Sequence, residues 1–298
     1  MPTMKKIKVQ TPAKINLSLE IVDRTENGFH MLSSVMQTVS LFDYLTFTKS
    51  EQISAENTII LSGNSKQIPY NEKNIVYKAI KAYFEVADIK NTKIEVEIEK
   101  NIPVEAGLAG GSTNAAGTLV AINSLFNNVL PNEKIHEIAA QLGSDLNFCL
   151  EGGACLLSSR GEIIEAKLPF QKYNILLAKP KDISISTGLC YKNFSQKYFE
   201  KKDASYSKKI VDLYNAKDFS PKALAELLYN DLEKPAIDMH TEITDIKEDL
   251  IRAGCINSLM SGSGSSVFGI YLNSITNKFS DNLEIFEVET TSCGVEIL

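Results

Sequence analysis

Apolar and polar residues alternate most regularly along residues 93–100. Ile94, Val96 and Ile98 alternate there with three glutamates, which is the period of a strand with one solvated face. Other apolar-rich stretches predict further strands over residues 7–22, 41–49, 173–180, 255–262 and 266–272.

Elsewhere the apolar residues recur every three to four positions, which is typical of amphipathic helices. Pro131 suits the first turn of one such helix, and Gly143 suits its end. The lysine-rich residues 196–209 indicate an exposed loop or a solvated helix end. Helices are predicted over residues 74–88, 115–126, 131–142, 221–233 and 241–253.

Helices and strands are thus mixed along the whole chain, and their pattern changes after residue 162. The length of 298 residues suffices for two domains with sizeable cores. We therefore expect an α+β fold of two domains, residues 1–160 and residues 161–298.

The composition limits the kinds of partner that we expect the protein to bind. The net charge is -6 and the pI is about 5.3, which argues against a general surface for nucleic acid or anionic membranes but allows one local phosphate pocket. Five cysteines without a CxxC pair indicate reduced, buried thiols and no zinc site. Without a signal peptide or an apolar run long enough to span a bilayer, we expect a cytoplasmic protein; its oligomeric state stays open.

One stretch indicates a phosphate site. Residues 103–117 read PVEAGLAGGSTNAAG and join a predicted strand to a predicted helix. Glycines allow close approach of a ligand to the backbone, and the free N–H groups at a helix start attract anions. The loop lacks the lysine of the P-loop and the spacing of the dinucleotide fingerprint. From the loop alone, a tight strand–helix turn with small residues for packing is the stronger interpretation.

The loop is one of several motifs in a recognisable order. The segments PAKINL (12–17), GLAGGSTNAA (107–116) and SGSGSSVFG (261–269) resemble the three motifs of the GHMP small-molecule kinases. NGFHML (27–32) and the run from residue 142 to 162 narrow the resemblance to members that phosphorylate a cytidine-diphosphate-linked methylerythritol. The resemblance implies two α+β domains with the active site in the cleft between them, ATP as phosphoryl donor, and Mg²⁺.

The resemblance assigns the loop to the ATP phosphates and the late turn to the opposite wall of the site. The ATP-binding residues it implies are Pro103, Val104, Glu105, Ala106, Gly107, Leu108, Ala109, Gly110, Gly111, Ser112 and Thr113. The turn consists of Ser261, Gly262, Ser263 and Gly264. Without the other motifs, this turn could equally be an ordinary connection between strands.

Asp145 matches the catalytic aspartate of that family and Lys14 its partner lysine. A carboxylate can accept the proton of an attacking hydroxyl, and a nearby ammonium can offset the charge of the phosphoryl oxygens. The alternatives are an aspartate that caps a helix and an exposed lysine. Protein ligands for Mg²⁺ are not evident from the sequence beyond Asp145 and the hydroxyls of Ser112 and Thr113.

The resemblance also implies a cytidine site. Phe29 and Tyr191 match aromatics that stack on the two faces of the base, His30 matches a hydrogen-bonding partner, and Thr187 and Asn16 match further substrate contacts. Each aromatic could instead belong to the core, and His30 could be structural, as we expect of His136 and His240.

Three residues depart from the family pattern: Asn147 replaces a usual proline, Ala109 a frequent glycine, and Glu105 adds a negative charge beside the phosphate loop. Two other functions remain as alternatives. One is another small-alcohol kinase of the same family, of the homoserine or mevalonate type, and the other is a non-catalytic nucleotide-binding relative.

Overall fold

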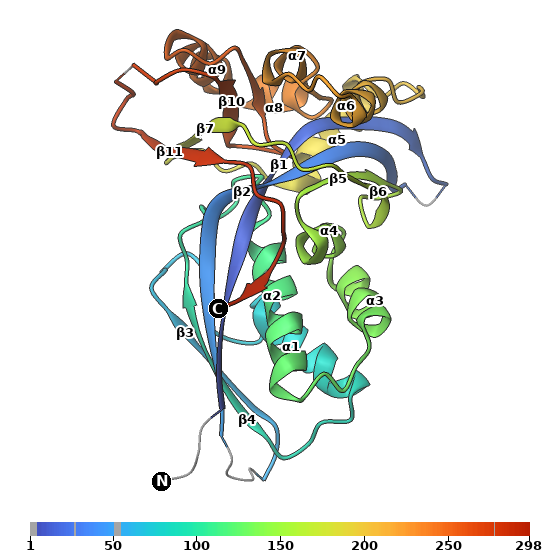
Figure 1. The fold of residues 1–298 in the computed structure, drawn as a ribbon, viewed down its shortest axis with the longest axis vertical. Coiled ribbons are helices and arrows are strands. Elements are labelled where there is room, and N and C mark those ends of the chain that lie inside the picture. Colours follow the sequence, from blue (N-terminus) through green and yellow to red (C-terminus); the bar gives the residue numbers. More distant parts are fainter. Residues whose placement is uncertain (1–4, 27, 51–54, 277) are drawn as a thin grey trace.

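The computed structural model describes residues 5–26, 28–50, 55–276 and 278–298. Two lobes lie one above the other, and two long strands run through both of them (Figure 1). These are β1 (Lys5–Arg24) and β2 (His30–Lys49), which pair antiparallel along almost their full length. Their continuity makes the two lobes parts of one scaffold.

The lower lobe is a sheet covered on one face by helices. The described strands follow the order β12-β1-β2-β4-β3, and α1, α2 and α3 lie against one side (Figure 1). The elements are β3 (Thr58–Gly63), α1 (Ile75–Val86), β4 (Lys93–Glu99), α2 (Gly110–Leu125), α3 (Asn132–Leu142) and β12 (Glu296–Ile297).

The upper lobe contains a second sheet with described strand order β11-β7-β10-β9. Its strands are β7 (Asn174–Pro180), β9 (Asn257–Met260), β10 (Val267–Tyr271) and β11 (Leu283–Glu289). The helices around it are α5 (Thr187–Lys197), α6 (Tyr206–Asn215), α7 (Pro221–Glu226), α8 (Glu233–Met239) and α9 (Glu242–Arg252).

A short helix and a hairpin connect the lobes. Helix α4 (Leu146–Glu151) precedes the hairpin of β5 (Ala154–Ser158) and β6 (Ile163–Leu168), and β5 pairs with β2. The division predicted near residue 160 therefore falls in the turn of this hairpin, and it stays a prediction. Within the described residues, none of the helices has both the length and the apolar character needed to cross a bilayer.

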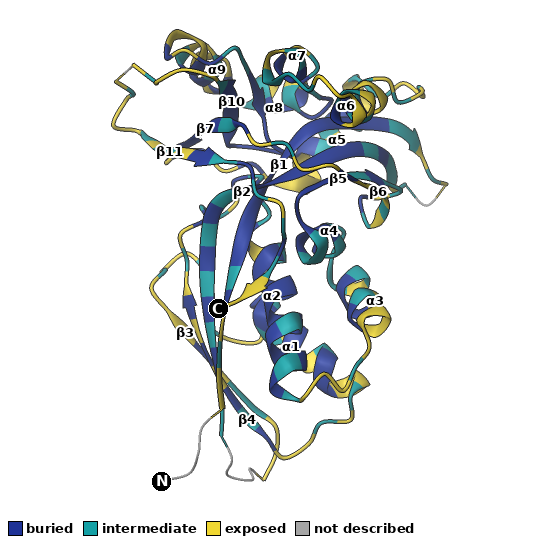
Figure 2. Cartoon of the chain, in the orientation of Figure 1, coloured by how far each residue is buried: buried dark blue, intermediate teal, exposed yellow. Residues whose placement is uncertain are grey.

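The elements with one solvated face match their sequence patterns. Strand β4 alternates buried and exposed residues. Helix α1 begins after Asn74, whose side chain accepts a hydrogen bond from the Val76 N–H at 2.9 Å, and it buries an apolar stripe against the sheet (Figure 2). The five cysteines are free thiols, and four of them are buried.

The helix predicted over residues 221–233 is wrong. The chain forms the short helix α7, the two-residue strand β8 (Tyr229–Asn230) and then α8. Asn230 donates from its side chain to the carbonyls of Met260 and Gly262, both at 2.8 Å, and Asp231 accepts the N–H of Ile21 at 2.6 Å. These tertiary bonds hold the segment extended against β1, where local propensity favours a helix.

A buried ion pair supports the start of the loop before α2. The carboxylate of Asp43 on β2 lies 2.6 Å from the ammonium of Lys100, and its other oxygen accepts the N–H groups of Asn101 and Ile102 at 2.6 and 2.7 Å. Burial lowers the pKa of Lys100, and the charge of Asp43 opposes that shift. The loop is thus fixed at its base by one carboxylate.

We expect Asp43→Asn to destabilise the fold by about 3–5 kcal/mol, because it leaves the Lys100 ammonium buried without a counter-charge. Equilibrium unfolding in urea measures this change. The matched control is Glu137→Gln, which removes the acidic partner of Lys134 in an exposed pair and should cost less than about 1 kcal/mol. Equal losses in the two variants would contradict the role given to Asp43.

Candidate active site

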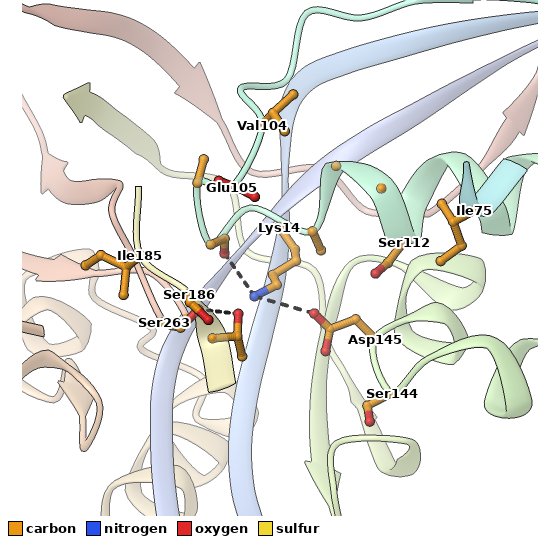
Figure 3. A pocket seen from close by; sticks show the side chains of 18 of the residues that line it. Lys14, Ile75, Val104, Glu105, Ser112, Ser144, Asp145, Ile185, Ser186 and Ser263 are labelled. Atoms are coloured by element: carbon orange, nitrogen blue, oxygen red, sulfur yellow. Dashed lines mark hydrogen bonds and ion pairs between the residues drawn. The ribbon is translucent and has the colours of Figure 1, made fainter. Parts of the chain in front are cut away.

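A cavity of about 1030 Å³ lies at the junction of the two lobes. Strand β1, the loop before α2, the segment before α4, the start of α5 and the turn after β9 all contribute to its lining. Figure 3 shows Lys14 pointing between the loop that carries Glu105 and the segment that carries Asp145, with Ser112 beside them. Segments far apart in the sequence therefore meet around one space.

The loop before α2 turns through left-handed backbone at alternate residues. Glu105, Gly107 and Ala109 have φ of 53°, 74° and 56°, and Ala109 is the N-cap of α2. Helix α2 begins at Gly110, so its first backbone N–H groups lack partners inside the helix. The loop thus presents a helix N-terminus to the cavity, which favours an anion there.

Gly107 is the point where the loop meets the upper lobe. A Cβ at this position would lie 2.0 Å from the Ser261 carbonyl oxygen, so only glycine fits. The Gly107 carbonyl accepts hydrogen bonds from the Lys14 ammonium and from the Ser261 hydroxyl, both at 3.0 Å. Three segments are joined at this one carbonyl oxygen.

Lys14 is buried on β1, and its ammonium is held by neutral partners. It donates to the side-chain oxygen of Asn16 at 2.7 Å and to the Gly107 carbonyl, and it lies 3.7 Å from the Asp145 carboxylate. Asn16 is oriented in turn, because its amide donates to the Ser34 hydroxyl at 2.9 Å. Ser34 then donates to the Ser18 carbonyl at 2.6 Å. The ammonium therefore occupies a fixed place with one face toward Asp145 and the cavity.

Asp145 stands at the N-cap position of α4, but its side chain makes no capping hydrogen bond. The side chain is 30% exposed and turns toward Lys14 (Figure 3). A carboxylate and an ammonium thus lie together beside the N-terminus of α2. This arrangement can deprotonate a hydroxyl next to a bound phosphate.

The opposite part of the cavity is aromatic. The Phe29 ring is 51% exposed, and the ring centroids of His30 and Tyr191 lie 5.0 Å apart. His30 Nε2 and the Ser195 hydroxyl are 2.6 Å apart. Burial lowers the pKa of His30, with a smaller contribution from Arg24, whereas burial raises the pKa of Tyr191, with a further contribution from Asp145. Neutral rings of this kind suit a planar, uncharged base.

The wall between these two parts comes from the upper lobe. Thr187 begins α5, and its hydroxyl lies 2.8 Å from that of Ser263. The turn of residues 261–264 is held to β8 through the bond from Asn230 to the Gly262 carbonyl. The start of α5 and this turn therefore form one continuous surface.

The comparisons with known proteins identify the family. The model described as "GHMP kinases N terminal domain" matches residues 74–153, and that described as "GHMP kinases C terminal" matches residues 213–284. The chain is 37% identical to the 4-diphosphocytidyl-2-C-methyl-D-erythritol kinase of Thermoanaerobacter pseudethanolicus, with 99% of each chain covered. It is 35% identical to the enzyme of the same name from Clostridioides difficile, with 98% of this chain and 97% of the relative covered.

Comparison with a solved structure indicates the same family. The chain superposes on a crystal structure of 4-(cytidine 5'-diphospho)-2C-methyl-D-erythritol kinase with a TM-score of 0.72 and 25% identity, covering 97% of this chain and 99% of the other. The chain belongs to the 4-diphosphocytidyl-2-C-methyl-D-erythritol kinases of the GHMP family. The predicted family and fold class are thereby confirmed.

Most residues that the GHMP resemblance singled out line the one cavity. They include Lys14, Asn16, Phe29, His30, Asp145, Thr187 and Tyr191, together with most of the loop and Gly262 to Gly264. Leu108, Thr113 and Ser261 are buried and do not line it. Ser261 instead donates to Gly107, and the Thr113 hydroxyl has no hydrogen-bond partner among the described residues.

Several lining residues of this GHMP kinase were not predicted, among them Lys73, Ser144, Ser186 and Arg160. The run LSSRGE placed Arg160 next to a recognised motif, but nothing in its spacing indicated that the side chain would reach the cavity. In the structure, the hairpin turn between β5 and β6 brings Arg160 to the cavity.

Two departures from the family pattern have structural partners. Asn147 pairs through its side chain with His136 Nδ1 at 3.0 Å and donates to the Glu162 carbonyl at 3.2 Å, so its polar group is used. Glu105 accepts a hydrogen bond from the Ser184 hydroxyl. The carboxylate therefore connects the loop before α2 to the segment before α5.

The glycines of the kinase loop have different roles, so they should respond differently to substitution. Gly107→Ala should lower stability by about 2 kcal/mol or more, because its Cβ collides with the Ser261 carbonyl at a strained φ. The matched control is Gly111→Ala, where the nearest atom to a Cβ is 3.8 Å away in Ile75. Thermal unfolding of both variants measures the difference. A stable Gly107→Ala protein would contradict the close contact between loop and turn.

Gly110 is a poorer position for this test than Gly107 or Gly111, because an added Cβ would lie 2.7 Å from the Lys100 ammonium. Gly110 and Gly111 both lie in the first turn of α2. Within the loop, positive φ occurs at Glu105, Gly107 and Ala109.

Proposed function

We propose that this chain transfers the γ-phosphoryl group of ATP to the 2-hydroxyl of 4-diphosphocytidyl-2-C-methyl-D-erythritol, yielding the 2-phosphate and ADP. The observation that carries the proposal is the meeting of Lys14 and Asp145 at the N-terminus of α2, in the same cavity as Phe29, His30 and Tyr191. Membership of the kinase family supports the same reaction.

The phosphates of ATP lie against the loop and the first turn of α2 in this proposal. Backbone N–H groups and the helix dipole supply positive potential there. The lysine that the loop itself lacks comes from β1, as Lys14. Its ammonium, bonded to Asn16 and Gly107, keeps its position while charge develops on the transferring phosphoryl oxygens.

Asp145 accepts the proton of the substrate's 2-hydroxyl as that oxygen attacks the γ-phosphorus. The proton moves to a carboxylate oxygen beside Lys14. Asn16 lines the same part of the cavity and is locked by Ser34, so it positions the ammonium. The cavity walls bring the hydroxyl and the phosphate into line, which supplies much of the rate enhancement in phosphoryl transfer.

Mg²⁺ accompanies ATP in the proposed reaction and neutralises charge on its phosphates. Among the described residues there is no group of three or more acidic, histidine or cysteine side chains that could hold a metal ion. The Asp145 carboxylate and the Ser112 hydroxyl line the cavity and would hold such an ion together with phosphate oxygens and water.

The cytidine site distinguishes the proposed substrate from other small alcohols. Homoserine and mevalonate have no base, and the aromatic wall of Phe29, His30 and Tyr191 would have no function toward them. A non-catalytic relative would not need Lys14 and Asp145 together. The proposal is tested by measuring ADP release with the cytidine-linked alcohol, with homoserine and with mevalonate. Faster turnover of homoserine or mevalonate would overturn it.

Asp145→Asn should fold and bind ATP but lose turnover by about 10²–10⁴-fold, the contribution expected of a general base. Lys14 keeps its bonds to Asn16 and Gly107 in this variant, so the site should stay intact. Single-turnover rates and ATP affinity measure the two effects. Ser144→Ala, at the neighbouring lining residue, is the control. A near-normal rate in Asp145→Asn would exclude Asp145 as the base.

Phe29→Ala should raise the KM for the cytidine substrate about 5- to 150-fold, the value of one base–aromatic stack, and leave the KM for ATP unchanged. Because the Phe29 ring is 51% exposed, its loss should cost little stability. The control is Phe170→Ala, since Phe170 is 48% exposed and does not line the cavity. Tyr191→Ala, which removes the second ring, should also raise the KM for the cytidine substrate.

The truncated alcohol methylerythritol 4-phosphate should be a very poor substrate, because binding of the remote cytidine positions the reacting hydroxyl. Equal rises in KM for both substrates in Phe29→Ala would indicate misfolding and leave the cytidine site without support.

A further inference from the structure

Arg160 lies in the turn between β5 and β6 and lines the cavity. This turn contacts both the start of β2 and the segment before α4. The Ser159 carbonyl accepts the Leu32 N–H at 2.6 Å, close to Phe29 and His30 at the start of β2. On the other side, a Cβ at Gly161 would lie 3.8 Å from the Ser144 Cβ and 4.0 Å from an Asp145 carboxylate oxygen. The turn therefore spans from the aromatic wall to the proposed base.

The guanidinium of Arg160 is held in place on one side. Its Nε donates to a Glu162 carboxylate oxygen at 3.2 Å, and the other oxygen accepts the Arg160 backbone N–H at 2.7 Å. The group lies 5.3 Å from the centroid of the Phe29 ring. No described residue forms a hydrogen bond with its two terminal nitrogens, and Arg160 lines the cavity.

The other cations that line the described cavity are Lys14, Lys73 and Lys100. Lys100 is bonded to Asp43, and Lys14 is bonded to Asn16 and Gly107 at the proposed transfer site. Lys73 directly precedes Asn74 and α1, and Arg160 is the cation that contacts the Phe29 ring. The cation beside Phe29 is thus Arg160.

We propose that Arg160 binds the diphosphate group of the cytidine-linked substrate through its two terminal nitrogens. The inference rests on the proposed function, because that substrate joins a base at Phe29 to a hydroxyl at Asp145 by a diphosphate. The anionic link must cross the space between these residues, where the turn carries Arg160. A planar guanidinium offers the paired donors that suit phosphate oxygens, and its contact with the Phe29 ring couples diphosphate binding to base stacking.

Calorimetric titration with cytidine and with cytidine 5'-diphosphate tests the inference without catalysis. The wild-type protein should bind the diphosphate more tightly than the nucleoside. Arg160→Ala should weaken diphosphate binding about 10- to 100-fold, the range for a charge-assisted hydrogen-bonded pair, and change cytidine binding much less. Arg160→Lys keeps the charge without the planar fork and should recover only part of the loss.

Arg24→Gln is the matched control. Arg24 lies near His30 and influences its pKa, but it does not line the cavity, so it reports the effect of a nearby charge without contact. We expect it to leave the preference for diphosphate over nucleoside unchanged. An equal loss in Arg24→Gln, or an equal loss of cytidine and diphosphate binding in Arg160→Ala, would overturn the inference.

Kinetics separate this inference from the proposed function. If the wild-type protein fails to phosphorylate the cytidine-linked alcohol while the diphosphate preference still depends on Arg160, the proposed reaction is wrong and the binding role of Arg160 stands. If the reaction occurs and the KM of Arg160→Ala for that alcohol equals the wild-type value, the reaction stands and the role of Arg160 is wrong.

Discussion

The hydrogen bond from the Lys14 ammonium to the Gly107 carbonyl is the contact on which the rest of the site depends. It joins β1 to the loop before α2, and the same carbonyl receives Ser261 from the upper lobe. The Lys14 backbone N–H also donates to the Leu108 carbonyl at 3.1 Å. A buried ammonium needs compensating partners. The loop before α2, the turn of residues 261–264 and Asp145 therefore all lie close to the Lys14 ammonium.

Strand β1 makes this possible because both of its faces are buried. Ile15 and Leu17 belong to the core. Lys14, Asn16, Ser18 and Glu20 form a buried polar row along the strand, and the register shift between Asn16 and Ser18 divides this row between the two faces. Each member of the row has a partner, and Glu20 accepts the backbone N–H groups of Ser205, Tyr206 and Ser207 at the start of α6. When every buried polar side chain has a hydrogen-bond partner, the side chains adopt one defined arrangement.

Sequence patterns predicted the elements that have one wet face, such as β4 and α1, since their period is set by local burial alone. They did not predict the first half of β2, where Ser34, Gln37 and Thr38 are buried and hydrogen-bonded and no alternation remains. Motif resemblance supplied the residues around Lys14 and Asp145. It could not supply Arg160, because its approach to Phe29 depends on how a hairpin turn packs against β2.

The long β1–β2 ladder runs into both lobes (Figure 1), with register shifts on either side of Lys14 and Asn16, which line the cavity. Rotation of one lobe against the other would have to break ladder hydrogen bonds on the cavity floor, so hinge opening there is costly. The segment that carries Ser184, in contrast, is exposed at the rim of the site. We therefore expect the backbone amides of β1 and β2 beneath the reacting groups to exchange their hydrogens more slowly than the amides at the rim.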